Sequence, residues 1–237
     1  MTRIGSTPGN TVDILYQGFG MRLAGAPIGY CTVPLITTAS GCTVLVDTGV
    51  HQTREMVLAG LQRLELEPDD VDYVVLTHLH FDHCENVGLF AKSTVVVHEA
   101  EIVEAEAHPS RDRYLADFWR ELLDRCKPIV MTGPSYNVDD EVTIHHLTGH
   151  RHGQLGVSVD TSAGRVVCCS DVAKNAREII VGEPPVSDPQ MLDAARRSIA
   201  WLRSTADIVV PGHDRTLSMV DGFPVWTDDQ NILVTIY

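Results

Sequence analysis

The sequence predicts a layered α/β fold with mixed β-sheets, formed by a single domain over residues 1–237. The chain has 237 residues, of which 44% are hydrophobic, enough for one sizeable α/β core. Short apolar runs alternate with segments whose apolar residues recur at helical spacing. Two of the apolar runs, Gly156–Thr161 and Arg165–Ser170, flank the turn Ser162-Ala163-Gly164 and predict a β-hairpin. Helices that alternate with strands, some of them adjacent, favour mixed sheets over a purely parallel one.

The first half of the chain supplies three strands and a helix. Thr43–Asp47 is a short apolar run that ends in a Thr-Gly turn, as a buried strand does. Thr53–Leu66 has apolar residues at helical spacing, and Pro68 lies just beyond it. Val71–Thr77 and Thr94–His98 are further buried strands.

The later segments continue the alternation. Glu99–Ala107 and Arg111–Cys126 predict helices, and the second carries an apolar stripe that packs inward or walls a pocket. Pro189–Arg203 predicts an amphipathic helix with Asp188 as its N-cap. Further strands are predicted at Val142–Leu147 and Asp207–Val210. The segment Gly18–Cys31 begins with glycine and predicts a loop, either packed on the body or bordering a pocket.

Charge and composition exclude several classes of function. Lys and Arg total 18 and Asp and Glu total 32, which gives a net charge of −14 and argues against nucleic acid as a partner. No apolar stretch approaches the length of a transmembrane helix, and the N-terminus does not resemble a secretory signal, so we expect a cytoplasmic protein without membrane contact. The six cysteines form no Cys-x-x-Cys pair and are interpreted as reduced, mostly buried residues.

One short motif concentrates the chemistry of the sequence. In Thr77-His78-Leu79-His80-Phe81-Asp82-His83, four side chains that can bind a metal fall within six positions, directly after a buried strand. Imidazole and carboxylate suit zinc and other borderline divalent cations. A single ion rarely takes all four ligands from so short a stretch, so two adjacent metals are the natural interpretation.

Three later positions complete such a site. His150 lies in Thr148-Gly149-His150, Asp171 in Cys169-Ser170-Asp171, and His213 in Pro211-Gly212-His213-Asp214. Each follows a predicted strand or lies in a glycine-containing loop, where a rigid sheet presents functional groups.

This ordered set of motifs resembles the metallo-β-lactamase superfamily over roughly residues 31–215. The resemblance implies a four-layer αβ/βα sandwich with two mixed sheets and a dinuclear metal site at their edge. By this resemblance His78, His80 and His150 bind one metal, and Asp82, His83 and His213 bind the other. Asp171 bridges the two metals together with a water or hydroxide. Asp47, in Asp47-Thr48-Gly49, orients a ligand histidine.

The resemblance also implies a hydrolytic mechanism. Two divalent ions, with zinc first and Mn, Fe or Co as alternatives, lower the pKa of the shared water so that hydroxide forms near neutral pH. The bridging hydroxide attacks a carbonyl that one metal polarises. Asp82 accepts the proton of the nucleophile and passes it to the leaving group, so Asp82 and Asp171 are the candidate catalytic residues.

Within the superfamily, the chain is most similar to the N-acyl homoserine lactonase group. The motifs around Asp47, the histidine cluster and the late Pro-Gly-His-Asp carry this similarity. That group usually has a tyrosine three residues after the bridging aspartate, where this chain has Lys174. The ammonium of Lys174 suits a substrate carboxylate or a polarised carbonyl. We therefore expect a lactone substrate, with an acidic group on it as one variant.

Several alternatives stay open at this point. The same site suits another activated acyl bond, namely a thioester, a cyclic amide or a β-lactam. Three further hypotheses are less favoured: phosphodiester cleavage, redox chemistry on iron, and a metal-binding module without turnover. The expected partner is a small-molecule acyl substrate, and a homo-oligomer is compatible with the sequence.

Overall fold

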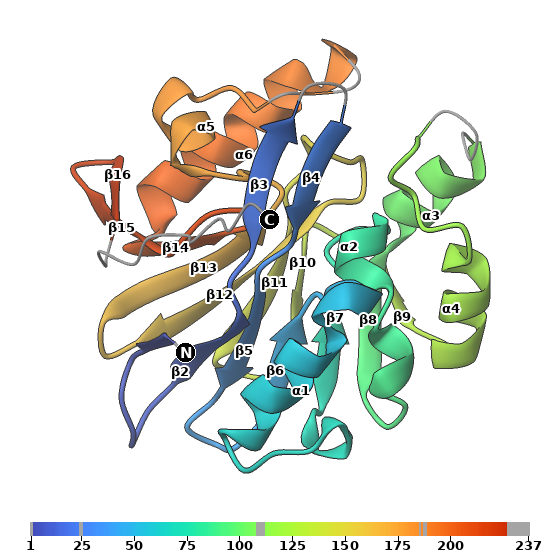
Figure 1. Cartoon of the computed structure of the whole chain (residues 1–237). Helices are drawn as coiled ribbons and strands as arrows, with labels where there is room; N and C mark the ends of the chain where they lie inside the picture. The colour runs from blue at the N-terminus through green and yellow to red at the C-terminus, as the bar shows by residue number, and fades with distance from the viewer. Residues whose placement is uncertain (1, 24–25, 108–111, 185, 187–188, 227–237) are drawn as a thin grey trace.

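Two seven-stranded sheets face each other in the computed structural model, with helices on the outer face of each (Figure 1). The structure describes residues 2–23, 26–107, 112–184, 186 and 189–226. Helices α1–α4 cover the first sheet and α5 and α6 cover the second. The four layers confirm the predicted αβ/βα sandwich of the metallo-β-lactamase fold. The helices are α1 Arg54–Gln62, α2 Phe81–Cys84, α3 Glu99–Ala107, α4 Trp119–Cys126, α5 Ala176–Val181 and α6 Leu192–Thr205.

Both sheets are mixed, as predicted. The first runs in the order β1 (Arg3–Ile4), β2 (Thr11–Tyr16), β5 (Val33–Thr37), β6 (Thr43–Val46), β7 (Tyr73–Val75), β8 (Thr94–His98) and β9 (Ile129–Met131). Its last four strands are parallel. The second sheet runs in the order β10 (Ser135–Asn137), β11 (Val142–His146), β12 (Leu155–Thr161), β13 (Gly164–Ser170), β14 (Ile208–Pro211), β15 (Leu217–Val220) and β16 (Phe223–Trp226). Here only β13 and β14 pair in parallel, and β12–β13 is the predicted hairpin.

Strands buried on both faces explain the continuous apolar runs in the sequence. In β6, Val44 and Val46 point into the core between the sheets, whereas Leu45 packs with the helices of the first layer. In β13, Cys168 faces the other sheet and Cys169 faces α5 and α6. Because successive side chains alternate across a strand, both faces must be apolar when both are covered.

The ends of four strands position the functional loops. Asp47 follows β6 and the histidine motif begins three residues after β7, at the carboxyl ends of two adjacent parallel strands. Asp171 follows β13 and His213 follows β14, which are also parallel neighbours. Carboxyl ends of parallel neighbours lie at one edge of a sheet, so both sheets present their functional loops from such an edge.

The predicted helix at Arg111–Cys126 is wrong in its first half. Arg111 lies outside the described residues, and α4 begins only at Trp119. The residues before it pair with the histidine motif instead: Tyr114 O accepts from Phe81 N at 2.8 Å, and Ala116 N donates to Leu79 O at 3.0 Å. These backbone groups serve a neighbouring segment, so they are not free for helical bonds.

Other element boundaries differ by smaller amounts. The helix predicted at Thr53–Leu66 is α1, which ends at Gln62, before Glu65 adopts a left-handed φ of 60°. The helix predicted at Pro189–Arg203 consists of a short 3-10 turn followed by α6. Its predicted N-cap, Asp188, lies outside the described residues.

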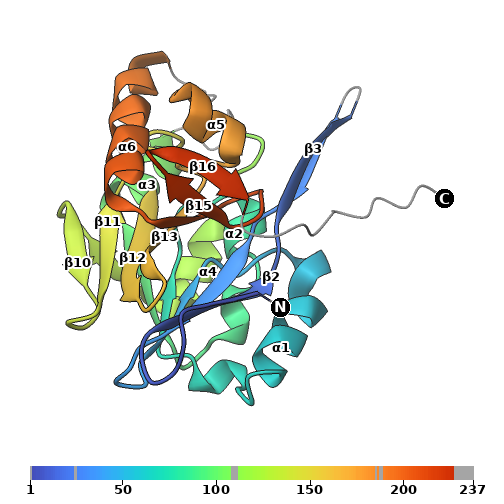
Figure 2. The ribbon, with the colours of Figure 1, turned by 90° about the vertical axis from the view of Figure 1, so that its left-hand side faces the viewer.

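The segment Gly18–Cys31 is a hairpin rather than a loop. Its strands β3 (Phe19–Leu23) and β4 (Ala26–Tyr30) pair with each other and project from the sandwich (Figure 2). A side chain at Gly18 would overlap the backbone of Thr32, which explains the glycine at the base of the hairpin. The hairpin lies against His213, so it does border the predicted site.

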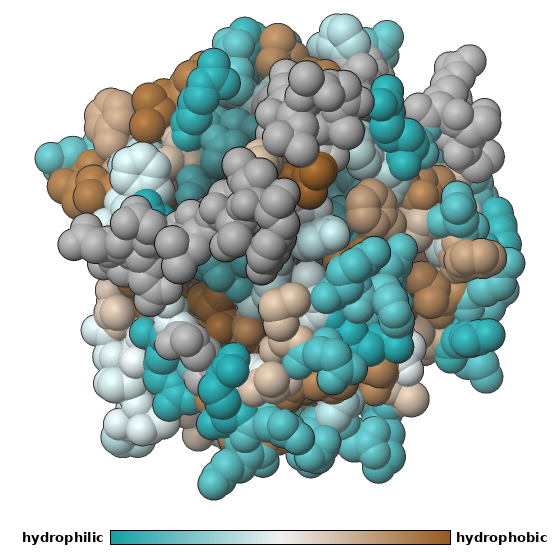
Figure 3. Space-filling view, viewed as in Figure 1, coloured by the Kyte–Doolittle hydropathy of each residue, from teal (hydrophilic) through white to brown (hydrophobic). Residues whose placement is uncertain are grey.

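Most cysteines of the described chain are buried, and one face of the surface is largely hydrophilic. The cysteines of the described chain are free thiols, and Cys31, Cys84, Cys168 and Cys169 are buried. Burial raises the pKa of the Cys31 thiol to about 12, which keeps it in the unreactive neutral form. Figure 3 shows hydrophilic residues over much of one face, with hydrophobic ones over the β15–β16 hairpin. Among the described residues, none of the helices has the length and apolar character that crossing a bilayer requires.

Candidate metal centre

All seven predicted ligand residues converge at the edge where the strand ends meet. Their side chains form two groups, and within each group the candidate ligand atoms lie within 4.8 Å of one another. We call His78, His80 and His150 the histidine half, and Asp82, His83 and His213 the mixed half. The grouping is the one that the sequence resemblance implied.

Asp171 links the two halves. Its Oδ2 lies 3.3 Å from His150 Nε2 in the histidine half, and its Oδ1 lies 3.1 Å from His213 Nε2 in the mixed half. The carboxylate is 2% exposed, and each of its oxygens faces a different half. Asp171 therefore occupies the position that a bridging ligand requires.

The chemistry of the cluster fits divalent metals. His78 Nε2 and His83 Nε2 are buried and have no hydrogen-bond partner among the described residues. Buried polar atoms without a partner are costly unless something else satisfies them. Imidazole and carboxylate ligands at this density are the donor set that zinc and related cations take.

Asp47 holds His83 from behind. Its Oδ2 accepts a hydrogen bond from His83 Nδ1 at 2.8 Å, which places the proton on Nδ1 and leaves the lone pair of Nε2 facing the cluster. Asp47 also accepts from Thr77 N at 2.8 Å, from Thr77 Oγ1 at 2.9 Å and from Ser170 Oγ at 2.9 Å. The sequence predicted that Asp47 orients a histidine, and the geometry identifies this histidine as His83.

Two more imidazoles have an oxygen at the nitrogen that points away from the cluster. His78 Nδ1 lies 3.1 Å from Thr77 Oγ1, and the Thr77 hydroxyl itself donates to Asp47. His213 Nδ1 lies 3.3 Å from the carbonyl of Phe19 in the projecting hairpin, which can only accept. In each case the outer nitrogen carries the proton and the inner lone pair is available to a metal.

His80 has a partner that the sequence did not reveal. Its Nε2 lies 3.0 Å from Asp112 Oδ2, whereas its Nδ1 faces His150 Nε2 at 3.1 Å. Asp112 lies 32 residues further along the chain, in the segment predicted as helix. The only available signal was an acidic residue near an aromatic stripe, which by itself indicates nothing about a metal site.

His150 is the exception among the five imidazoles. Its outer nitrogen, Nδ1, lies 3.0 Å from the Nζ of Lys174, which also lies 3.1 Å from Asp171 Oδ2. An ammonium has only donors, so His150 Nδ1 must accept and its proton must sit on Nε2. This arrangement is incompatible with a metal on His150 Nε2.

The pKa shifts of the histidines differ between the two halves. Burial lowers the pKa of His78 and of His150, and Lys174 adds to the effect at His150. Burial acts in the same direction on His213, but the neighbouring Asp171 carboxylate outweighs it and raises the pKa. Burial alone would raise the pKa of Asp171, but Lys174 and His213 hold it well below its usual range. The lowered pKa favours the ionised form of the Asp171 carboxylate at neutral pH.

Gly212 permits the close approach of the segment after β14 to Asp171. A Cβ at this position would overlap Asp171 Oδ1 and press on the carbonyl of Ser170. Gly212 N also donates to Ser170 O at 2.9 Å. Only glycine fits between these groups, which gives a physical reason for the Pro-Gly-His sequence.

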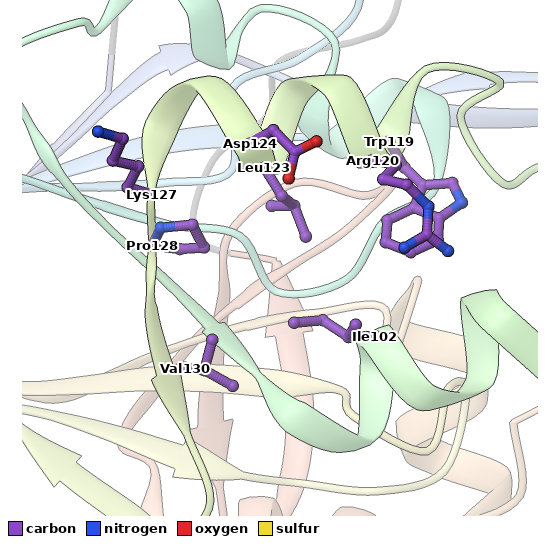
Figure 4. A pocket seen from close by; sticks show the side chains of 8 residues that line it. All are labelled: Ile102, Trp119, Arg120, Leu123, Asp124, Lys127, Pro128 and Val130. Atoms are coloured by element: carbon purple, nitrogen blue, oxygen red, sulfur yellow. The ribbon is translucent and has the colours of Figure 1, made fainter.

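A surface hollow of about 360 Å³ lies elsewhere, between α3, α4 and β9. In Figure 4, Leu123, Ile102 and Val130 point into it from these elements. None of the predicted ligand residues lines it. The candidate metal ligands therefore lie at the carboxyl ends of the strands and not in this hollow.

Comparisons with known proteins agree with this geometry. The sequence model of the metallo-beta-lactamase superfamily matches residues 27–213. The metallo-beta-lactamase domain-containing protein 1 of Xenopus laevis is 29% identical over 206 residues, covering 86% of this chain and 79% of that protein. The N-acyl homoserine lactonase of Bacillus thuringiensis is 28% identical over 157 residues, covering 65% of this chain and 60% of the lactonase.

Two solved structures share the fold. A mutant of Bacillus thuringiensis AiiA with N-decanoyl-L-homoserine bound at its active site has a TM-score of 0.69 at 20% identity, covering 90% of this chain and 94% of that one. The dizinc quorum-quenching lactonase AidC has a TM-score of 0.69 at 14% identity, covering 97% of this chain and 98% of that one. At these identities the likeness shows the fold alone.

Proposed function

This chain belongs to the metallo-beta-lactamase superfamily, and from that premise we propose that it is a dinuclear-metal hydrolase that opens a lactone. One observation carries the proposal: two groups of three ligand side chains share a single buried carboxylate, Asp171. The lactone is supported by the similarity to an N-acyl homoserine lactonase. The expected partner is thus a small acyl compound.

The residues of the cluster have separate roles in this reaction. Two divalent ions, zinc first, would lower the pKa of a water between them and polarise the ester carbonyl. The Asp171 carboxylate holds the two halves at a fixed separation. Asp82 lies 3.7 Å from the Nε2 atoms of both His83 and His213 and is 7% exposed. Its carboxylate is placed to accept the proton of the nucleophile and return it to the alkoxide leaving group.

Lys174 supports an acidic group on the substrate. A neutral imidazole has one lone pair, so His150 cannot accept from Lys174 and bind a cation through Nε2 at the same time. Metal binding at the histidine half therefore releases the ammonium from His150. The Lys174 side chain is 28% exposed, so solvent and substrate can reach it. A substrate carboxylate is a suitable new partner for the released ammonium.

The first test is proton release in a pH-stat over a panel of short, long and carboxylated lactones, one β-lactam and one thioester. Lactone turnover that a chelator abolishes and added zinc restores would support the proposal. Turnover of only the thioester or the β-lactam would keep the mechanism and replace the substrate. Metal binding without turnover of any panel member would favour a module that binds metal without catalysis.

A Lys174 series separates the charge from the rest of the site. We expect Lys174→Ala to lower kcat/KM for a carboxylated substrate about 10- to 100-fold, because a hydrogen bond to a charged group contributes roughly 1.5–3 kcal/mol. The same variant should change kcat/KM for an uncharged lactone by less than threefold. Lys174→Tyr, which restores the residue typical of the lactonase group, should favour the uncharged lactone. An equal loss on both substrates would remove the carboxylate role.

A second candidate is hydrolysis of another activated acyl bond that carries a carboxylate, such as a β-lactam. Lys174 is the observation that favours it, because its ammonium lies beside the metal cluster. Phosphodiester cleavage is disfavoured by the net charge of −14, which repels a polyanionic substrate.

A further inference from the structure

We propose that Asp112 is a positioning residue that, with the buried Glu101–Arg151 ion pair, holds His80 and its neighbours ready for a metal in the histidine half. The inference rests on the proposed function only in that the cluster binds divalent metals; it does not depend on the substrate. The proposed effect is selective: the network supports the histidine half of the cluster and not the mixed half.

The contact between Asp112 and His80 fixes the tautomer of the ring. Asp112 Oδ2 can only accept, so the proton lies on His80 Nε2, and Nδ1 presents its lone pair toward His150. A carboxylate at the outer nitrogen also makes the inner one a stronger metal ligand.

Asp112 belongs to a segment that is bound to the ligand motif along its backbone. Leu115 forms a β-bridge with His80. Phe81 N donates to Tyr114 O at 2.8 Å, and Ala116 N donates to Leu79 O at 3.0 Å. The carboxylate therefore comes from a segment whose backbone is hydrogen-bonded to the ligand motif on both sides of Leu115.

Arg151 extends the network to the second ligand segment. It directly follows His150, and its guanidinium donates to Asp112 Oδ2 and, at 3.0 Å, to Glu101 Oε1. Glu101 is fully buried in α3 and also accepts from Leu79 N at 2.9 Å, between His78 and His80. One acidic side chain of α3 thus contacts both segments that supply the histidine half.

A second acid of α3 secures the same turn. Glu104 accepts from His152 N at 2.7 Å and pairs with Arg151 at 3.3 Å. The backbone of Gly153 packs so closely on Glu101 that a Cβ there would overlap the helix. The turn after His150 is therefore seated directly on α3.

The mixed half depends on other groups. His83 is held by Asp47, and His213 by the carbonyl of Phe19. Within the described ranges, neither Asp112 nor the Glu101–Arg151 pair makes a hydrogen bond to the mixed half. Removing Asp112 should accordingly weaken one metal and spare the other.

The test compares metal binding by Asp112→Ala, Asp112→Asn and the full-length parent. Each protein is stripped with a chelator and titrated with zinc against a chromophoric competitor, which yields one dissociation constant for each metal. We expect Asp112→Ala to weaken one of the two about 10- to 100-fold and to change the other less than threefold. Asp112→Asn keeps an acceptor for His80 Nε2 and should recover part of the loss. Asp117→Ala removes an exposed acid from the same segment and should match the parent.

Cobalt spectra assign the weakened metal to its half. At one equivalent of cobalt, the absorption of Asp112→Ala should resemble that of His80→Ala, in which the histidine half is damaged. It should differ from that of His213→Ala, in which the mixed half is damaged. Circular dichroism melts of the stripped proteins show whether each variant is folded. If Asp112→Ala is unfolded, Asp112→Asn is compared with the parent in its place.

The outcomes distinguish this inference from the proposed function. Selective loss of one metal, whether or not any lactone is hydrolysed, supports the positioning role. Equal weakening of both metals, or no weakening in a folded variant, overturns it while leaving lactone hydrolysis untouched. A parent protein that binds no divalent metal overturns both.

Discussion

Replacing Asp171 by asparagine should abolish most of the activity while leaving the chain folded. The amide is nearly the same size, but it cannot offer a negatively charged oxygen to each half of the cluster. We expect the variant to retain at most one tightly bound metal and to lose about 10³-fold or more in kcat. This loss corresponds to the several kcal/mol of transition-state stabilisation that metal ions supply. Metal analysis after gel filtration and initial rates on the best panel substrate measure both quantities.

The pH dependence sharpens this prediction. Lys174 and His213 outweigh burial and lower the folded-state pKa of Asp171, so its carboxylate stabilises the fold above its ordinary pKa. That contribution is lost only as the pH falls through the lowered value. The parent should therefore keep a stability advantage over Asp171→Asn at neutral pH, and the advantage should shrink in strong acid. A variant with two metals and a kcat within threefold of the parent would contradict the bridging role. Asp193→Asn, at an exposed position of α6, serves as the charge control.

Replacing Asp47 by alanine should lower the free energy of unfolding more than any of the other substitutions proposed above. Asp47 is 1% exposed and accepts hydrogen bonds from Thr77, Ser170 and His83. Breaking a buried charged network leaves its donors unpaired, so we expect the free energy of unfolding to fall by about 3–5 kcal/mol. For a chain of this size, that loss corresponds to a Tm lower by roughly 10 °C. Thermal unfolding of the metal-stripped proteins measures the effect without the contribution of bound metal.

Two control variants separate the parts of the Asp47 effect. Asp47 has a φ of 60°, a left-handed conformation that alanine tolerates poorly. Asp221 has a φ of 52° at an exposed turn, so Asp221→Ala measures the backbone cost without the network. Asp47→Asn tolerates the same backbone and keeps one oxygen acceptor, and it should lose less stability than Asp47→Ala. If Asp47→Ala and Asp221→Ala lost the same stability, the buried network would contribute nothing measurable.

Seven of the sixteen strands that the structure describes, β6–β8 and β11–β14, and the grouping of the candidate ligand residues could be predicted from the sequence because both depend on local spacing. Apolar runs such as Thr94–His98 form strands wherever both faces are covered, and the structure places β8 over the same residues. Four metal-binding side chains within six positions have few interpretations other than a metal site, whatever the rest of the fold. Glycine before His150 and before His213 likewise marked the loops that bring these residues to the cluster.

Segments without strong local periodicity were harder to interpret. The residues before Trp119 have helical spacing, but their backbone hydrogen bonds go to the histidine motif. The Gly18–Cys31 segment has the composition of a loop, yet its strands pair with each other beside His213. In both cases a partner distant in sequence decided the local conformation, and single-segment patterns contain no information about such a partner.

The sequence by itself thus determined the family, the layered α/β fold and the residues that can bind metal, because these follow from residue type and short-range spacing. Only the tertiary structure decided which atom of each imidazole faces the cluster and which group holds it there. Asp112 contacts His80 across 32 residues, and Arg151 contacts Glu101 across 50. Such contacts exist only after the sheets and helices have packed. The packing also placed Lys174 beside His150, where we propose that its ammonium binds a carboxylate of the substrate.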